Sequence, residues 1–291
     1  MHRQSRLFDY VNHTFLILIA LICVYPFVLI MATSLSDGKE VVSGTIYLWP
    51  KGINFEAYKY ILSNSRLGVA SGLANSLFYT AVGGAIAVMV TFMTAYPLSR
   101  KRLVGRYVIM LVFMFTWVFE AGIIPNYIVY NALDLVNSRW VMILPMAVNT
   151  FLLIITKSFL DALPEELEEA AVIDGANDWQ IMWRVFFPLS KPIIATISVF
   201  NAVFIWNQFL VPMIYLQERS LQPITVVLYN MIINSSKGGT SFENITVNGV
   251  QLLPQNLQAA SIFLAVAPIL LIYPFTQRFF TKGILIGSVK G

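Results

Sequence analysis

The residues best suited to chemistry in this chain lie in one charged stretch, residues 161–190, between two apolar runs. Glu165, Glu166, Glu168 and Glu169 crowd together there, and paired carboxylates can act as general acid and base. No histidine or second cysteine accompanies them: His2 and His13 stand near the amino terminus, and the single Cys23 lies in an apolar run. We therefore expect no catalytic residues, no metal site and no disulfide within the chain.

Local signals in this stretch predict a short helix, a turn and a second helix. Pro164 can occupy a first helical turn, where its missing N–H is not needed. The glutamates that follow it suit the positive end of a helix dipole. Gly175 is the residue type that ends a helix in a left-handed turn, and Asn177 or Asp178 can cap the second helix.

The second helix is expected to present Trp179, Ile181, Met182 and Phe186 before Pro188 ends it. Such an apolar stripe must be buried somewhere. Two interpretations are open: it packs on the rest of its own chain, or it enters the groove of a partner.

The elements around this stretch are those of a membrane protein. The chain has 291 residues, of which 57% are hydrophobic and 12% charged, whereas soluble domains carry about 25% charged residues. The mean hydropathy is +0.71. Since a spanning helix needs roughly 20 apolar residues, we predict an all-α, polytopic protein with six transmembrane helices. They are expected at about 13–34, 70–97, 107–131, 139–160, 192–216 and 257–280.

The placement of lysine and arginine predicts the orientation, because cytoplasmic loops carry an excess of both. Arg100-Lys101-Arg102, just after the second apolar segment, is the strongest indication. It places both termini, the stretch 161–190 and a tail at 281–291 in the cytoplasm. No small-residue cleavage site follows the first segment, so we interpret it as an uncleaved span.

Several functions are disfavoured by what the sequence lacks. It contains no G-x-x-x-x-G-K-[ST] phosphate loop, so any ATP hydrolysis must belong to another polypeptide. A secondary transporter should show an internal repeat and spans broken at corresponding positions, and neither is visible. An integral membrane enzyme needs a catalytic set such as paired carboxylates or metal-ligand histidines at a membrane face, and it is the less favoured alternative. Basic residues form no patch interleaved with aromatic residues, so nucleic acid is not an expected partner.

One motif identifies a family resemblance. Glu169-Ala170-Ala171, three residues, Gly175, nine residues and Val185-Phe186-Phe187-Pro188 resemble the EAA loop of ABC importer permeases, with Val185 and Phe187 as mild apolar departures from its pattern. Residues 171–176 and 188–192 resemble the carbohydrate-uptake branch most closely. Further similar segments are Tyr25-Pro26, residues 95–100, Trp206-Asn207 and the end of the chain, residues 287–291, which is similar to the tail of the second permease of maltose-type importers.

The resemblance implies a type I ABC permease fold and a division of labour. Separate cytoplasmic ATPase subunits would hold ATP and Mg, and this chain would bind no cofactor. The other implied partners are a second homologous permease, an extracytoplasmic solute-binding protein, a saccharide and the lipid bilayer of a bacterial cytoplasmic membrane. The residues implied to couple to the ATPase are Glu165, Glu168, Glu169, Ala170, Ala171, Asp174, Gly175, Ala176, Trp179 and Pro188, with Ser288, Lys290 and Gly291 of the tail.

Polar side chains inside spans are candidates for a substrate pathway, because they are costly in lipid. Sugar sites combine an aromatic face with amides, which suits the fifth segment. The competing interpretation for each residue is a structural hydrogen bond between helices, and both stay open. The candidates are Asn75, Glu120, Asn149, Asn201, Trp206, Asn207 and Gln208.

The expected cargo is an oligosaccharide or polysaccharide, with the alginate importer among the similar systems. A uronate cargo would require cations along its path, and the predicted spans offer none at mid-depth. A permease for peptides or amino acids is the alternative within the same family.

Overall fold

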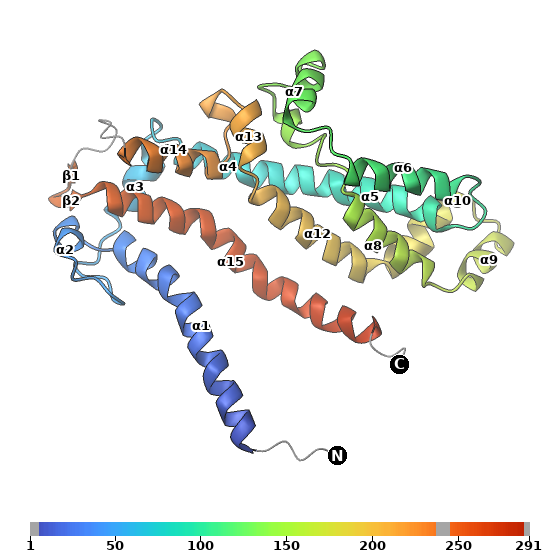
Figure 1. Ribbon diagram of the computed structural model, residues 1–291, viewed down its shortest axis with the longest axis horizontal. Coiled ribbons are helices and arrows are strands. Elements are labelled where there is room, and N and C mark those ends of the chain that lie inside the picture. The colour runs from blue at the N-terminus through green and yellow to red at the C-terminus, as the bar shows by residue number, and fades with distance from the viewer. Residues whose placement is uncertain (1–5, 237–244, 288–291) are drawn as a thin grey trace. The chain divides into compact units, whose positions relative to one another are not determined.

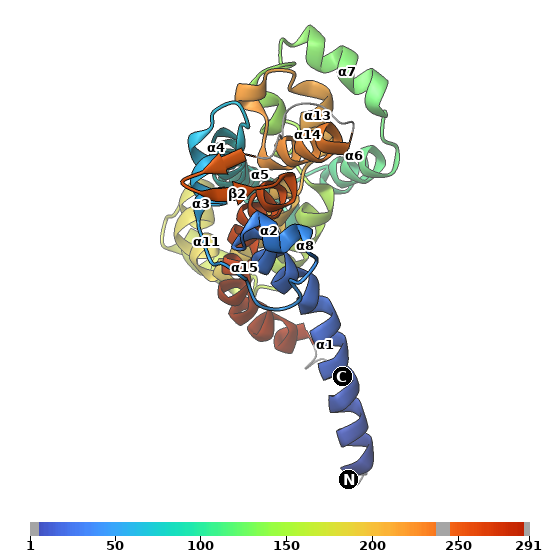
Figure 2. The same cartoon turned by 90° about the vertical axis from the view of Figure 1, so that its left-hand side faces the viewer.

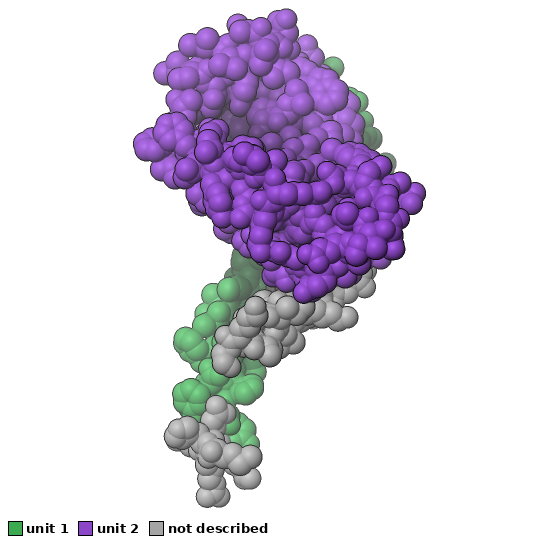
Figure 3. All heavy atoms as spheres, turned by 90° about the vertical axis from the view of Figure 1, so that its right-hand side faces the viewer, with its two compact units in different colours: residues 1–70, 227–268 green, residues 71–226, 269–291 purple. Residues whose placement is uncertain are grey.

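The computed structural model describes the backbone of residues 6–236 and 245–287, and the side chains of 8–233 and 245–271. The chain divides into two compact units, coloured separately in Figure 3. The first comprises residues 1–70 with 227–268, and the second comprises residues 71–226 with 269–291. Most of the described chain is helical, as the composition predicts.

The first unit holds the long helix α1 (Arg6–Ser34), whose side chains are exposed from Tyr10 to Phe27. Short helices α2 (Gly38–Val42) and α3 (Glu56–Ser63) follow it. Strands β1 (Ile245–Val247) and β2 (Val250–Leu252) form an antiparallel hairpin that contacts both short helices (Figure 2).

A buried asparagine closes this unit. The Nδ2 of Asn256, at the start of α15 (Pro254–Gly287), donates to the carbonyls of Thr33 at 3.0 Å and Ser36 at 2.9 Å. Its Oδ1 accepts from the Leu253 amide at 3.2 Å. The amide is completely buried, so these bonds satisfy groups that would otherwise be costly to hide from water.

The second unit is built around one helical rod. Helix α4 (Val69–Phe78) continues through the π-helical turn η1 (Tyr79–Gly83) into α5 (Gly84–Ser99). Helices α8 (Thr150–Asp161) and α12 (Lys191–Trp206) lie side by side with α5 (Figure 1). Buried Val88, Leu152 and Ile197 join the three helices.

Three predicted segments are interrupted. The run 107–131 is split into α6 (Arg106–Val118) and α7 (Ile123–Ala132), bent by 114°. Gly122 lies at the break with φ +84°, a conformation that favours glycine. The run 139–160 forms the 3₁₀ turn η2 (Arg139–Met142) and then α8, and 192–216 forms α12 and α13 (Leu210–Tyr215).

The structure therefore does not have a continuous helix through any of these three runs. Among the described residues, three helices are long and apolar enough to cross a bilayer. The number rises to as many as five if each of two bent pairs is one span, namely Arg106–Val118 with Ile123–Ala132 and Asp178–Leu189 with Lys191–Trp206. The predicted connector 217–256 also contains structure, with η4 (Arg219–Leu221) and α14 (Ile224–Ser236) besides the hairpin. Hydropathy measures composition, which does not reveal where a backbone bends.

Candidate functional site

The charged stretch forms the predicted helix, turn and second helix. Helix α9 (Glu166–Ile173) ends at Asp174, and Gly175 follows with φ +78°. The Gly175 amide donates to the Val172 carbonyl and the Ala176 amide to the Ala171 carbonyl, both at 3.0 Å. These two bonds define a Schellman motif, in which a left-handed residue satisfies the last carbonyls of a helix. The predicted left-handed turn at Gly175 is confirmed.

The second helix begins with a capping box. The Gln180 amide donates to Asn177 Oδ1 at 2.9 Å, and the Asn177 amide donates to Gln180 Oε1 at 3.0 Å. Asn177, rather than Asp178, is therefore the cap. The helix runs through α10 (Asp178–Gln180), the π-helical η3 (Ile181–Phe186) and α11 (Phe187–Leu189). It continues one residue past Pro188 and then meets α12 at a bend of 80°.

The apolar stripe of the second helix is buried in its own unit. Ile181 and Phe186 are fully buried, and Met182 nearly so. They share a core with residues of α5 and α8, including Phe92 and Leu160. Most of the stripe is therefore covered within its own unit, whereas Trp179 at its start stays exposed.

A different apolar surface stays uncovered. Leu167, Val172, Ile173 and Trp179 project from α9 and the start of α10, with Ile173 85% exposed and Trp179 59% exposed. Among the predicted coupling residues, Ala171 and Ala176 pack against the core. Besides Trp179, the exposed members of the predicted coupling set are Glu165, Glu169, Ala170, Asp174, Gly175 and Pro188.

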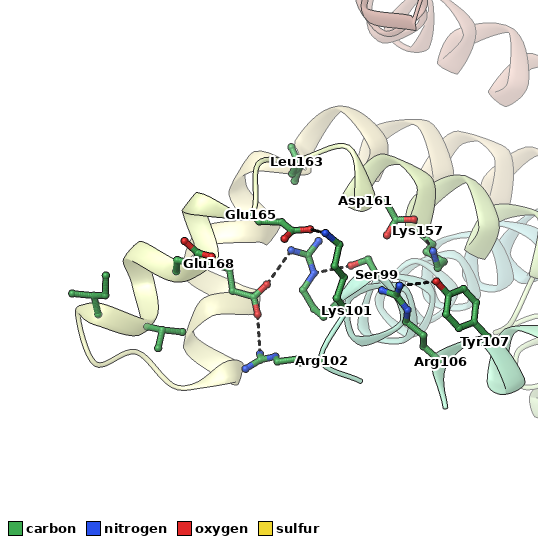
Figure 4. A pocket seen from close by; sticks show the side chains of 14 residues that line it. Ser99, Lys101, Arg102, Arg106, Tyr107, Lys157, Asp161, Leu163, Glu165 and Glu168 are labelled. Carbon is green, nitrogen blue, oxygen red and sulfur yellow. Dashed lines mark hydrogen bonds and ion pairs between the residues drawn. The ribbon is translucent and has the colours of Figure 1, made fainter. Parts of the chain in front are cut away.

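Ion pairs tie α9 to the end of α5. Glu168 accepts from Arg100 at 3.1 Å and pairs with Arg102 at 3.2 Å, and Arg102 also reaches Asp178 at 2.6 Å. Glu165 pairs with Lys101. Figure 4 shows Glu168 directed toward Arg102 and Glu165 toward Lys101, and all four residues line a cavity of about 740 Å³.

The charges of this cluster shift two pKa values. The hydrogen bond from Lys101 lowers the pKa of the Glu165 carboxyl, against an opposing effect of desolvation. Partial burial disfavours the charged form of Arg102, but the bond to Asp178 and the charges of Glu168 and Asp178 outweigh it and raise its pKa. Both shifts favour the charged forms of Glu165 and Arg102.

The sequence did not single out Arg100 as a site residue. Its side chain is only 6% exposed, unlike those of Lys101 and Arg102. The cluster Arg100-Lys101-Arg102 indicates orientation as a group, but its first member is buried. Its place in the segment 95–100, which shares the family resemblance, was the available signal.

The predicted substrate residues divide into two groups. Glu120, Asn149 and Gln208 come together around a second cavity of about 290 Å³, which is also lined by Tyr130 and Tyr215. Asn149 additionally caps α8, accepting from the Leu152 amide at 3.1 Å.

The other candidates do not line this cavity. Asn75 donates to the carbonyls of Ser220 at 2.7 Å and Gln222 at 3.1 Å. Trp206 is buried, and Asn207 is exposed and donates to Val203 at 2.9 Å. Asn201 is buried, and its Nδ2 has no hydrogen-bond partner among the described residues.

Two further predictions concern the tail and metals. Helix α15 continues to Gly287, so the predicted tail residues Ser288, Lys290 and Gly291 lie outside the described residues. Over the ranges that the structure describes, no group of three or more histidine, cysteine or acidic residues could hold a metal ion.

A helical membrane fold with a buttressed, exposed helix–turn–helix defines a class: the permease subunits of ABC importers. The model of the family described as "Binding-protein-dependent transport system inner membrane component" matches residues 5–286. The chain belongs to this family. It is an ABC transporter permease and not an enzyme, as the EAA motif predicted.

Similar proteins cover almost the whole chain. The polygalacturonan/rhamnogalacturonan transport system permease protein YtcP of Bacillus subtilis is 41% identical over 288 residues, covering 99% of this chain and 100% of that one. Protein LplC of the same organism is 39% identical, covering 99% and 97%.

A solved structure agrees with these relatives. It is the crystal structure of a bacterial ABC transporter involved in the import of the acidic polysaccharide alginate. The matching chain has a TM-score of 0.87 and 31% sequence identity, with coverage of 96% of this chain and 99% of that one.

Proposed function

We propose that the chain is one of two related permeases in an ATP-driven importer of an acidic oligosaccharide or polysaccharide. It would cross the bacterial cytoplasmic membrane six times with both termini inside, and residues 161–190 would transmit the motion of two ATPase subunits. Those subunits would hold ATP and Mg, and an extracytoplasmic binding protein would deliver the cargo. Ser288, Lys290 and Gly291 are expected at the ATPase interface.

The observation that carries the coupling role is the uncovered apolar surface on a rigid base. Most of the apolar stripe of the second helix is already buried in its own unit. The exposed Ile173 and Trp179 side chains would therefore be buried only against another protein. Exposed apolar groups rimmed by charges are typical of protein interfaces. A helix pair fixed by a Schellman motif, a capping box and ion pairs moves as a body, which suits the transmission of displacement.

The cargo proposal rests on the relatives. YtcP is named for polygalacturonan and rhamnogalacturonan, and the structural neighbour belongs to an alginate importer. The cavity around Glu120, Asn149 and Gln208 has amides and tyrosines suited to sugar hydroxyls and ring faces. Its volume of about 290 Å³ lies near the lower end of small-molecule sites, about 300–1,000 Å³.

The charge of this cavity has a consequence for the assembly. Among the described residues that line it, Glu120 is the charged one, and none is a lysine or arginine. A carboxylate repels a uronate, so the cations that neutralise the cargo are expected from the second permease or the binding protein. Asn75, Asn201, Trp206 and Asn207 remain candidates for other parts of the pathway.

Substitution of Ile173 by Asp tests the coupling surface. A charge at this exposed position should reduce the amount of ATPase that copurifies with the permease pair, because it would be desolvated in the interface. Val104→Asp is the matched control, since Val104 is 94% exposed in the turn between α5 and α6. Equal ATPase recovery from both variants would contradict the assignment.

Uptake into proteoliposomes that contain the whole importer tests the cargo. ATP-dependent uptake of oligogalacturonate, with little uptake of a neutral oligosaccharide of equal length, is expected. Preference for a neutral sugar would overturn the acidic assignment. Preference for a peptide or an amino acid would support the alternative within the family.

A further inference from the structure

One buried guanidinium joins the elements that converge on the coupling stretch. Arg100, the residue at the end of α5, donates from Nη1 to Glu168 of α9 at 3.1 Å and from Nη2 to the carbonyl of Leu160 in α8 at 2.8 Å. Its Nε donates to Ser99 Oγ at 3.0 Å, and its Cζ lies 4.4 Å from the ring centre of Phe186 in η3.

We propose that Arg100 is a positioning residue through which displacement of α9 reaches α5 and α8 together. This inference rests on the coupling role proposed above. Through the backbone, α9 joins α8 directly by residues 162–165, whereas α5 is far away in sequence: Arg100 and Glu168 are 68 residues apart. The guanidinium supplies a buried polar link between α9 and the end of α5, beside the more exposed pairs of Lys101 and Arg102.

Burial makes this link stronger than the surface pairs around it. The Arg100 side chain is 6% exposed and Glu168 is 17% exposed, whereas Lys101 and Glu165 are 72% and 59% exposed. Charges removed from water interact more strongly, and exposed pairs contribute little. Lys101–Glu165 lies beside the buried bond and reaches the same helix end, so it is the natural comparison.

The geometry requires arginine rather than lysine. Three acceptors take hydrogen bonds from three different nitrogens of the guanidinium, while its Cζ lies over the ring of Phe186. A planar fork with several donors can meet these demands at once, whereas a lysine ammonium is a point charge on a flexible stem. Lysine could keep the pair with Glu168 but would lose the stack and the fixed direction.

Replacement of Arg100 by Met should leave a folded permease. Glu168 keeps Arg102 at 3.2 Å, so its charge is not stranded. Methionine also suits the apolar surroundings of Phe186 and Tyr96. The Leu160 carbonyl, in the last turn of α8, loses the guanidinium as a donor but still accepts from the Leu163 amide at 3.4 Å.

The test measures cargo molecules imported per ATP hydrolysed by the complete importer in proteoliposomes. Arg100→Met should lower this ratio at least about tenfold, because the loss of even one charge-assisted hydrogen bond corresponds to about that factor. The ATPase should still copurify. Arg100→Lys should restore part of it. Lys101→Met, the matched control, should stay within about twofold of the unsubstituted importer, as expected for an exposed pair.

A second measurement separates positioning from general stability. If Arg100 acts through Glu168, Arg100→Met should cost less in a Glu168→Gln background than alone, because the two residues form one unit. An unchanged ratio in Arg100→Met, or equal effects in the two backgrounds, would overturn the inference. Should Arg100→Met not fold, Glu168→Gln alone must still lower the ratio.

Failure of this inference is distinguishable from failure of the proposed function. If Arg100 has no such role, the unsubstituted importer still takes up cargo with ATP, and the Ile173→Asp variant still copurifies with less ATPase. If the coupling role itself is wrong, the Ile173→Asp variant copurifies with the normal amount of ATPase, whatever the result for the Arg100 variants.

Discussion

Replacement of Gly175 probes the turn between α9 and α10 without disturbing the packing around it. Gly175 has φ +78°, and a Cβ built there meets no atom within 4 Å. A substitution therefore costs backbone energy alone. The core formed by Phe92, Leu160 and Phe186 is untouched.

The magnitude follows from the backbone conformation. An L-residue in the left-handed region costs roughly 1–2 kcal/mol, a factor of about 5–30 in a two-state equilibrium. Alanine at position 175 should thus depopulate the native turn by that factor, and a β-branched valine by more, since it is an outlier there. Asparagine tolerates the conformation and should cost least.

The assay is ATP-dependent cargo uptake by proteoliposomes carrying each variant, with the yield of folded complex measured in parallel. Uptake should fall in the order Gly, Asn, Ala, Val, and Gly175→Val should abolish it. The thermal unfolding midpoint of the membrane domain should stay near that of the unsubstituted protein, because the turn lies outside its core.

Two results would refute this reasoning. Gly175→Val with uptake equal to Gly175→Asn would show that the left-handed turn is not required for transport. A loss of folded complex that parallels the loss of uptake would show that the turn serves folding of the whole domain instead.

Three other outcomes are expected. Asn177→Ala removes the cap that pairs with Gln180 and should destabilise the second helix by about 1 kcal/mol, seen as faster amide hydrogen exchange; unchanged exchange would contradict the capping role. Asn75→Ala leaves the carbonyls of Ser220 and Gln222 unpaired, and should lower the thermal unfolding midpoint without changing the KM for cargo; a changed KM at unaltered stability would place Asn75 on the pathway. The isolated chain should neither bind nor hydrolyse ATP, because its sequence has no phosphate loop; hydrolysis by the purified chain would refute this.

Features that depend on neighbouring residues were predictable from the sequence. The glycine turn at Gly175 and the cap before the second helix both follow from chemistry within a few residues. The EAA motif around Glu169 is equally local, and its family assignment is confirmed by the match over residues 5–286.

Helix continuity was predicted less well. The apolar runs 107–131 and 192–216 were expected as single helices, but each is interrupted, at Gly122 in the first and between Trp206 and Leu210 in the second. Apolar content is similar on both sides of such a break, so a hydropathy pattern passes through it. The side-chain roles of Asn75 and Asn201 were equally hidden, because a polar residue in an apolar run can face a cavity or another helix.

The sequence by itself determined that the chain belongs in a membrane and that residues 161–190 form a helix, a turn and a helix, because composition, proline, glycine and caps act locally. Only the tertiary structure decided which apolar surface is covered and which is free. It buries Ile181 and Phe186 and leaves Ile173 exposed. It alone brings Arg100 to Glu168, since a pair separated by 68 residues is specified by the packing of α5 and α8 and not by spacing along the chain.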